Sequence, residues 1–246
     1  MLGHMSDVWM ITGATAGFGR ALAEEALAAG HTVVAAVRRP EAMDLEHERL
    51  SVVQLDVTDG ATIPEVVAGA LEQHGRIDVL VNNAGTGSRA AAVQDVREDD
   101  WRRVVDTNLT GSFLCAQAAY DLMLRQDPKG GRIINNGSIS AHVPRPQGIA
   151  YTASKHAITG LTKGLELEGR PHGITACQID IGNAATAMTA RMEQGVLQPD
   201  GSIATEPTFD PKIVADFVVR IAELPTSVAV PTLTVMAAGM PYVGRG

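Results

Sequence analysis

The sequence has few aromatic residues and few cysteines. Aromatic side chains make up only 4% of the 246 residues, so a buried core has to be built from Ala, Val, Ile and Leu. The two cysteines, Cys115 and Cys177, stand in apolar segments with no C-x-x-C spacing and no histidine cluster nearby. This pattern predicts buried free thiols and argues against a disulfide or a metal site.

Long apolar runs and an excess of positive charge are absent too. No apolar run approaches the roughly 18 residues of a membrane-spanning helix, and no signal peptide stands at the start. We therefore expect a cytoplasmic protein with no membrane partner. The net charge of −8 argues against a nucleic-acid surface. It does not exclude an anionic small molecule, because one local arginine is enough to bind it.

Short apolar runs alternate with helical patterns along the whole chain. Continuous apolar strands that alternate with helices indicate a parallel sheet covered on both faces. No break divides the pattern into two cores, so we predict a single α/β domain over residues 1–246, with no metal. Strands are expected at 8–12, 32–37, 51–55, 77–82, 132–136, 174–179 and 228–235, and helices at 18–29, 61–74, 99–123, 150–168 and 212–223.

A glycine-rich turn stands between the first expected strand and the first expected helix. In this position backbone N–H groups and the positive helix end face an anion, which is typical of a pyrophosphate site. The spacing is Gly-x-x-x-Gly-x-Gly instead of G-x-G-x-x-G, and an ordinary turn is the alternative interpretation. The candidate cofactor residues here are Gly13, Thr15, Gly17, Phe18 and Gly19.

Tyr151 and Lys155 stand four residues apart in a helical pattern, downstream of Ser138. Residues i and i+4 share a helix face, so the phenol and the ammonium can point into one pocket. A nearby cation favours phenolate, so we expect Lys155 to lower the pKa of Tyr151 from its ordinary value of about 10. Tyr151 would then exchange a proton at working pH, while the Ser138 hydroxyl holds the substrate oxygen.

Together these motifs make the chain resemble the short-chain dehydrogenase/reductase family over nearly its whole length. Residues 12–19 fit its T-G-x-x-x-G-x-G motif, and residues 82–85 fit its N-N-A-G motif. Within the family, the chain resembles 3-oxoacyl-carrier-protein reductases and sugar or alcohol dehydrogenases. The resemblance implies a Rossmann-type, doubly wound sheet of seven strands in the order 3-2-1-4-5-6-7. Residues that match the catalytic tetrad are Asn108, Ser138, Tyr151 and Lys155.

The resemblance also implies further site residues. A kink at Asn108, which is unfavourable inside a helix, would aim its carbonyl at a water that relays protons through Lys155; an exposed helical Asn is the alternative. Asp56 and Val57 would meet the adenine, or Asp56 would only start a turn, and both interpretations stay open. The other implied cofactor contacts are Asn83, Ala84, Gly85, Tyr151, Lys155, Gly182 and Thr186.

No acidic residue stands directly after the second expected strand. NAD-specific enzymes usually have one there to bind the ribose hydroxyl, whereas this chain has Arg38 and Arg39. A guanidinium fits a phosphate bidentately. NADP(H) is therefore the expected cofactor, with NAD(H) as the alternative, and solvated charges after a strand are the competing interpretation of the arginines.

Residues 184–209 follow the sixth expected strand and contain several Gly and Pro residues. The resemblance implies a substrate-binding lid, and an ordinary surface loop is the alternative. The substrate-facing segments, 142–147 and 184–202, are low in charge and suggest a modestly apolar site. Gly182 follows Ile181 where the family often has Pro, so the backbone there is less restricted.

The expected function is hydride transfer between NADP(H) and a carbonyl or secondary alcohol, with Tyr151 as general acid/base. A non-catalytic NADP-binding regulator, and an epimerase or dehydratase on the same fold, are the alternatives. The expected helices 99–123 and 150–168 are apolar around much of their girth, and in the family they pair with symmetry mates. A homo-oligomer, most simply a tetramer, is therefore expected.

Overall fold

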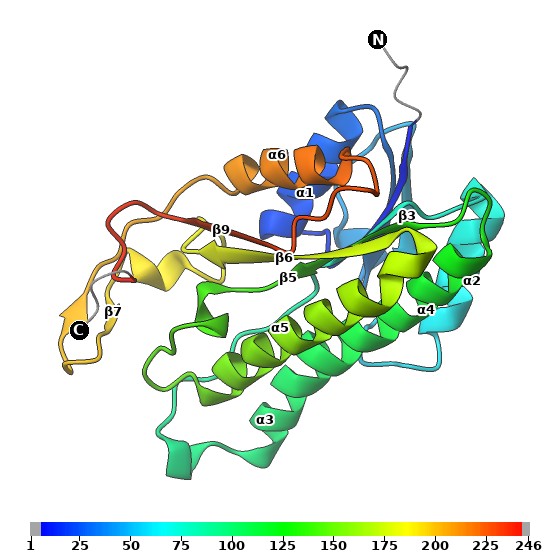
Figure 1. The fold of residues 1–246 in the computed structure, drawn as a ribbon. Coiled ribbons are helices and arrows are strands. Elements are labelled where there is room, and N and C mark those ends of the chain that lie inside the picture. The colour runs from blue at the N-terminus through cyan, green and yellow to red at the C-terminus, as the bar shows by residue number, and fades with distance from the viewer. Residues whose placement is uncertain (1–5, 243–246) are drawn as a thin grey trace.

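A seven-stranded parallel sheet forms the centre of the molecule (Figure 1). The structure is a computed structural model that describes residues 6–242. The strand order, β3-β2-β1-β4-β5-β6-β9, confirms the predicted doubly wound order, with β9 as the seventh strand. The strands are β1 (Val8–Thr12), β2 (Thr32–Val37), β3 (Leu50–Gln54), β4 (Val79–Asn82), β5 (Gly131–Asn136), β6 (Ile174–Gly182) and β9 (Thr232–Met236).

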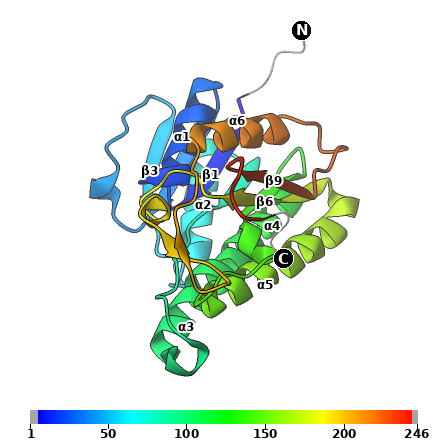
Figure 2. The ribbon, with the colours of Figure 1, turned by 90° about the vertical axis from the view of Figure 1, so that its left-hand side faces the viewer.

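Helices cover both faces of the sheet (Figure 1, Figure 2). Side chains alternate along a strand, so Trp9 and Ile11 of β1 enter one core while Val8 and Met10 enter the other. The first core lies under α1 and α6, and the second lies against α2 and α4. The helices are α1 (Gly17–Ala28), α2 (Ile63–His74), α3 (Glu98–Val105), α4 (Gly111–Arg125), α5 (Ile149–Gly169) and α6 (Pro211–Ala222).

The structure differs from the predicted elements in three places. A π-helical turn, Asp106–Thr110, divides the expected helix 99–123 into α3 and α4. A short hairpin of β7 (Val196–Leu197) and β8 (Ile203–Ala204) lies within residues 184–209. The edge strand β9 begins only after Pro231. Short 3-10 turns occupy Pro40–Ala42, Val93–Asp95, Ile139–Ala141, Arg170–His172 and Ala190–Met192.

The carboxyl ends of the parallel strands meet at one edge of the sheet, where open α/β sheets bind ligands. Figure 2 views this edge, with residues 184–209 in front of it in yellow and orange. Cys115 and Cys177 are buried free thiols, as predicted, and burial raises the pKa of each to about 12. Within residues 6–242, no helix combines the length and the apolar character that crossing a bilayer requires.

Candidate active site

The glycine-rich turn between β1 and α1 depends on conformations and contacts that only glycine allows. Gly13 and Gly17 have φ angles of +70° and +58°, in the left-handed region that favours glycine. A Cβ atom at Gly19 would lie 2.4 Å from the Gly13 carbonyl oxygen and 2.3 Å from the Asn83 amide nitrogen. Glycine at position 19 therefore lets α1 start directly against the turn.

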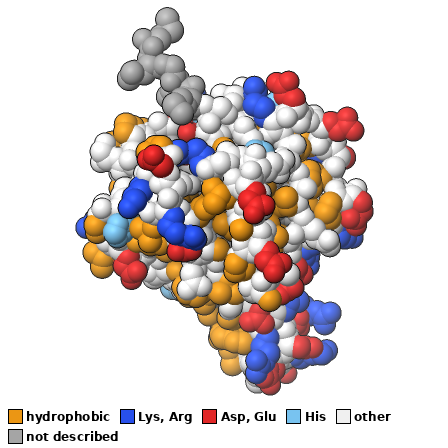
Figure 3. All heavy atoms as spheres, turned by 90° about the vertical axis from the view of Figure 1, so that its right-hand side faces the viewer, with side chains coloured by type: hydrophobic (Ala, Val, Ile, Leu, Met, Phe, Trp, Pro, Cys, Tyr) orange, Lys and Arg blue, Asp and Glu red, His pale blue; other side chains and the backbone are white. Residues whose placement is uncertain are grey.

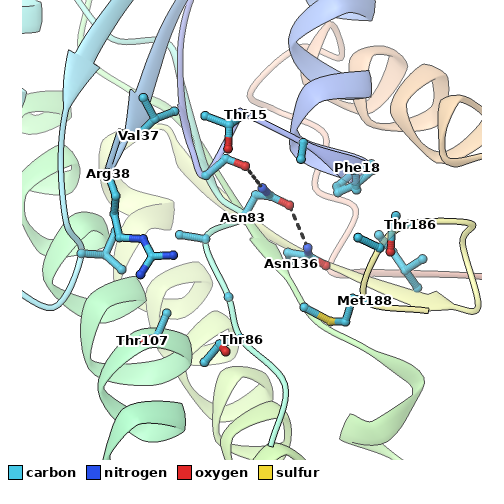
Figure 4. Close-up of a pocket in the computed structure, with 18 of the residues that line it drawn as sticks. Thr15, Phe18, Val37, Arg38, Asn83, Thr86, Thr107, Asn136, Thr186 and Met188 are labelled. Atoms are coloured by element: carbon cyan, nitrogen blue, oxygen red, sulfur yellow. Dashed lines mark hydrogen bonds between the residues drawn. The ribbon is translucent and has the colours of Figure 1, made fainter. Parts of the chain in front are cut away.

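Hydrogen bonds fasten this turn to the end of β4. The Thr12 hydroxyl accepts from the backbone N–H groups of Asn83 and Ala84, both at 3.0 Å. The Asn83 amide donates to the carbonyls of Thr12 and Gly13, each at 3.0 Å. Asn136, at the end of β5, donates in turn to the Asn83 side-chain oxygen at 3.0 Å. These hydrogen bonds connect the ends of β1, β4 and β5 beside one cavity (Figure 4).

This first cavity has a volume of about 440 Å³ and extends from the end of β2 to Tyr151. Its size lies in the range of small-molecule and cofactor pockets. Gly19, Lys155 and Gly182 do not line it; Gly182 is buried, and a Cβ there would lie 2.8 Å from the Met236 Cβ. The expected cofactor residues that line it are Gly13, Thr15, Gly17, Phe18, Arg38, Asp56, Val57, Asn83, Ala84, Gly85, Tyr151 and Thr186.

Arg38 extends its guanidinium into this cavity (Figure 4). None of the ion pairs within residues 6–242 involves its side chain, so the charge is available for an anion. Asp56 also lines the cavity, and it starts a turn by accepting from the Thr58 N–H at 3.0 Å. That bond, together with the Thr58 hydroxyl and the charge of Arg38, lowers the pKa of Asp56. Both interpretations of Asp56 are therefore compatible with the geometry.

Tyr151 lies where the first cavity meets a second one of about 340 Å³. Ser138 lines the second cavity, and the influence of its hydroxyl lowers the pKa of the Tyr151 phenol. The buried ammonium of Lys155 lies 5.5 Å from the centre of the Tyr151 ring and donates to the Asn136 carbonyl at 2.6 Å. The structure thus brings Ser138, Tyr151 and Lys155 together as the sequence predicts.

The expected effect of Lys155 on Tyr151 is not observed. Burial raises the pKa of Tyr151 above its ordinary value, and this influence outweighs the lowering by the Ser138 hydroxyl. Burial also lowers the pKa of Lys155 to about 8. The prediction of a lowered Tyr151 pKa is therefore wrong for this structure, because the desolvation of the phenolate outweighs the groups that lower its pKa.

Asn108 is buried in the π-helical turn, so the alternative of an exposed helical Asn is wrong. Its side chain accepts from the Thr86 N–H at 2.8 Å and donates to the Thr86 carbonyl and the Ser154 hydroxyl. Its carbonyl accepts from the Ser112 hydroxyl at 2.9 Å. Asn108 therefore joins the loop after β4 to α5, and its relay water stays a prediction.

Arg145, which lines the second cavity, belongs to an ion pair that the sequence does not reveal. The Arg145 guanidinium donates to both carboxylate oxygens of Glu206, at 2.8 and 2.5 Å. Asn183 and Gln198 donate to the same carboxylate at 2.8 and 3.0 Å. Burial alone would raise the pKa of Glu206, but these hydrogen bonds lower it to about 2. The segments 142–147 and 184–202 are expected to be low in charge, yet Arg145 of the first pairs with Glu206, just beyond the second. This buried pair joins the loop before α5 to residues 184–209.

Metal ligands are not clustered in the part of the chain that the structure describes. Among residues 6–242, no group of three or more His, Cys, Asp or Glu side chains is placed to hold a metal ion. The lining of the first cavity instead fits a dinucleotide. Its glycines leave room for close approach of a pyrophosphate, and Arg38 offers a guanidinium for a further phosphate.

Comparison with known proteins connects this geometry to a family. The model of the family described as short chain dehydrogenase matches residues 7–196. The chain is 34% identical to 3beta-hydroxysteroid dehydrogenase of Mediterraneibacter gnavus over 81% of this chain and 74% of that protein. It is 35% identical to 3-oxoacyl-[acyl-carrier-protein] reductase of Synechocystis sp., over 76% of this chain and 78% of that protein.

Solved structures agree with the sequence relatives. The closed form of serine dehydrogenase complexed with NADP+ superposes with a TM-score of 0.84 and 27% identity, over 96% of this chain and 97% of that one. Fold, motif order and sequence identity all agree. The chain belongs to the short-chain dehydrogenase/reductase family of oxidoreductases.

Proposed function

We propose that the protein transfers a hydride between NADP(H) and a carbonyl or secondary alcohol, with Tyr151 as the general acid/base. The observation that supports this most strongly is the position of Tyr151. Its side chain borders both the cavity with the glycine-rich turn and the cavity behind Ser138. A phenol at this junction can reach a substrate oxygen in the second cavity while a nucleotide occupies the first.

The protein side chains have distinct roles in this proposal. A nicotinamide nucleotide bound in the first cavity would supply or accept the hydride. Ser138 donates to the substrate oxygen and orients it toward the Tyr151 phenol. Because its raised pKa keeps the Tyr151 phenol protonated at neutral pH, Tyr151 is ready to protonate a carbonyl that is being reduced. Lys155 lies behind the first cavity, bonded to the Asn136 carbonyl, and its contact with the ribose stays a prediction. Asn108 keeps α5 and the loop after β4 in register.

NADP(H) is the proposed cofactor, and Arg38 is the residue proposed to select it. Its guanidinium lies in the first cavity with no ion-pair partner among residues 6–242, and the serine dehydrogenase structure was determined with NADP+. Gly182 and Gly19 act on the cofactor only by packing behind the site. Residues 184–209 are proposed to cover the substrate, since Met188, Thr189 and Met192 line the second cavity.

NADPH consumption with a panel of ketones, sugars and acyl thioesters tests this function. We expect loss of NADPH absorbance with at least one carbonyl compound. Tight NADPH binding with no consumption across the panel would favour a non-catalytic regulator. A changed product with no net loss of NADPH would favour an epimerase or dehydratase. Either result would replace the proposed reaction.

A homo-oligomer, with a tetramer as the simplest form, is part of the same proposal. Phe113 of α4 is 44% exposed, and Leu167 and Ile149 of α5 are 64% and 43% exposed. Figure 3 shows hydrophobic side chains between charged groups on the face of the molecule at the right-hand side of Figure 1. Pairing of α4 and α5 with a second copy would bury Phe113, Ile149 and Leu167. Sedimentation velocity at micromolar concentration should show a tetramer, and a single monomeric species would contradict this.

A further inference from the structure

Asp180 is a fully buried carboxylate directly behind Ser138. It lies near the end of β6 and is 0% exposed. One oxygen accepts from the Ser138 N–H at 2.8 Å and from the Gln178 side chain at 2.7 Å, and the other lies 2.7 Å from His142 Nε2. The carboxylate thus connects β6, the end of β5 and the 3-10 turn after Ser138.

The end of β5 is shaped to admit this carboxylate. A Cβ atom at Gly137, the residue before Ser138, would lie 2.2 Å from the Asp180 oxygen and 2.8 Å from Gln178 Cγ. Any other residue at position 137 would collide with Asp180. Glycine at 137 and aspartate at 180 are therefore matched, independently of any hydrogen bond.

Three charged groups lie around Tyr151, each from a different segment, and a fourth titratable group lies one step further away. Asp180 comes from β6, Lys155 from α5, and Arg145 from the loop before α5, while His142 lies behind Asp180 and is 38% exposed. The negative charge of Asp180 raises the pKa of both Tyr151 and Lys155, whereas Arg145 lowers that of Tyr151. Asp180 and Arg145 thus act on the pKa of the Tyr151 phenol in opposite directions.

We propose that Asp180 is a positioning residue of the active site, which fixes Ser138 through its backbone N–H and places a carboxylate near Tyr151 and Lys155. This inference rests on the proposed role of Tyr151. Asp180 lines neither cavity, so it touches no ligand and acts only through its neighbours. His142 does not line either cavity, and its contact with Asp180 connects the buried carboxylate to the protein surface.

The charge of Asp180 predicts the direction in which the pKa values of Tyr151 and Lys155 should change when the charge is removed. Removing an anion lowers the pKa of a neighbouring acid and of a neighbouring base alike. The substitution Asp180→Asn keeps the shape of the side chain but removes its charge. The Tyr151 titration and the pH profile of turnover should therefore both move to lower pH, by on the order of one pH unit. Turnover at fixed pH should fall, while the dissociation constant for NADPH stays unchanged.

The phenolate absorbance of Tyr151 measures this without any need for turnover. The chain has only three tyrosines, so the difference between each protein and its Tyr151→Phe counterpart isolates one phenol. Because the reading is independent of substrate, it reports on Asp180 even if the proposed reaction is wrong. The pH profile of kcat/KM then shows whether the same shift reaches the chemistry.

Glu166→Gln is the matched control. Glu166 is also a buried carboxylate on a backbone N–H of β6, that of Ala176 at 2.8 Å, but it lies at the far end of α5 from Tyr151. The Glu166→Gln variant should leave the Tyr151 titration unchanged. If Asp180→Asn does not fold, Asp180→Ala removes the same charge without placing an amide group in the buried site. A folded Asp180 variant whose Tyr151 titration moves no further than that of Glu166→Gln would overturn the proposal.

Discussion

The two sides of Tyr151 are built in different ways. On the nucleotide side, backbone groups and glycines of the turn 12–19 interlock with the end of β4, and most hydrogen bonds involve the main chain. On the substrate side, buried charges hold the geometry: Glu206 fixes Arg145, and Asp180 fixes Ser138. The nucleotide side, at the first cavity, is held mainly by backbone groups close to one another at the strand ends. The substrate side, at the second cavity, depends on pairs of side chains that are far apart in the sequence.

This difference predicts how each side fails. The turn 12–19 contains no titratable side chain, so we expect it to bind a nucleotide over a wide pH range. A buried ion pair depends on protonation and on both partners, and loss of one partner leaves an uncompensated charge. Variants that damage one side and leave the other intact therefore test the comparison.

The largest effect is expected at the junction of the two sides. Tyr151→Phe removes the phenol and leaves the ring that borders both cavities. Turnover should fall by about 10²–10⁴-fold, the usual contribution of general acid catalysis, while NADPH affinity stays the same. Stopped-flow NADPH absorbance and nucleotide fluorescence measure the two quantities separately.

Tyr120→Phe is the control for that substitution, because Tyr120 of α4 lines neither cavity. It should change neither turnover nor affinity. Turnover of Tyr151→Phe within a factor of a few of wild type would refute the role of the phenol. A large loss of NADPH affinity would instead mean that the two sides are not separable.

The second-largest effect is expected from Glu206→Gln, which disrupts the ion pair on the substrate side and leaves the nucleotide side unchanged. Because the pKa of Glu206 is lowered from 4.5 to about 2, its stabilisation is complete above pH 4.5 and is lost as the pH falls toward 2. Glu206→Gln should therefore reduce the free energy of unfolding by about 3 kcal/mol at neutral pH. The difference from wild type should shrink steadily between these two pH values.

Chemical denaturation at a series of pH values measures this effect. The affinity for NADPH should stay at the wild-type value, and KM for the carbonyl substrate should rise as Arg145 loses its partner. Thr208→Ala, outside the ion pair but in the same segment, serves as the control and should leave the pH dependence unchanged. A pH-independent difference between Glu206→Gln and wild type would show that the ion pair is not its cause.

The smallest effect sharpens the nucleotide side. Arg38→Asp places an acidic group where the guanidinium enters the first cavity. The ratio of NADPH to NADH affinity should fall by about tenfold or more, since a phosphate partner becomes a like charge. Arg39→Asp, which also lines the cavity, should change the ratio less. A wild-type protein that binds NADH as tightly as NADPH would contradict the proposed preference.

The same contrast explains what could be predicted from the sequence. The glycine-rich turn and the spacing of Tyr151 and Lys155 are local patterns, and the structure places them as predicted. Strand order follows from the alternation of apolar runs with helices together with the family resemblance. Even so, the helix 99–123 is interrupted by a π-helical turn, which no local pattern marks except an unfavourable Asn at position 108.

The substrate side could not be predicted in this way. Arg145 and Glu206 stand 61 positions apart, and nothing in the residues around either one indicates that the two side chains meet. Asp180 lies just beyond the expected strand 174–179, although β6 extends to Gly182. Its contact with Ser138 depends on the register of β5 against β6, in which Asn136 pairs with Ile179. The pKa of Tyr151 was mispredicted for a related reason, because burial is a property of the folded chain.

Transfer of a deuteride from NADPH that carries deuterium at both hydrogens of the nicotinamide C4 position tests the central claim most directly. The wild-type protein, given a carbonyl compound that it reduces, should yield an alcohol with one deuterium on the former carbonyl carbon, as read by mass spectrometry. The Tyr151→Phe variant should bind the labelled nucleotide and yield essentially no labelled alcohol. Alcohol formed without deuterium, or formed equally well by the variant, would contradict hydride transfer that depends on Tyr151.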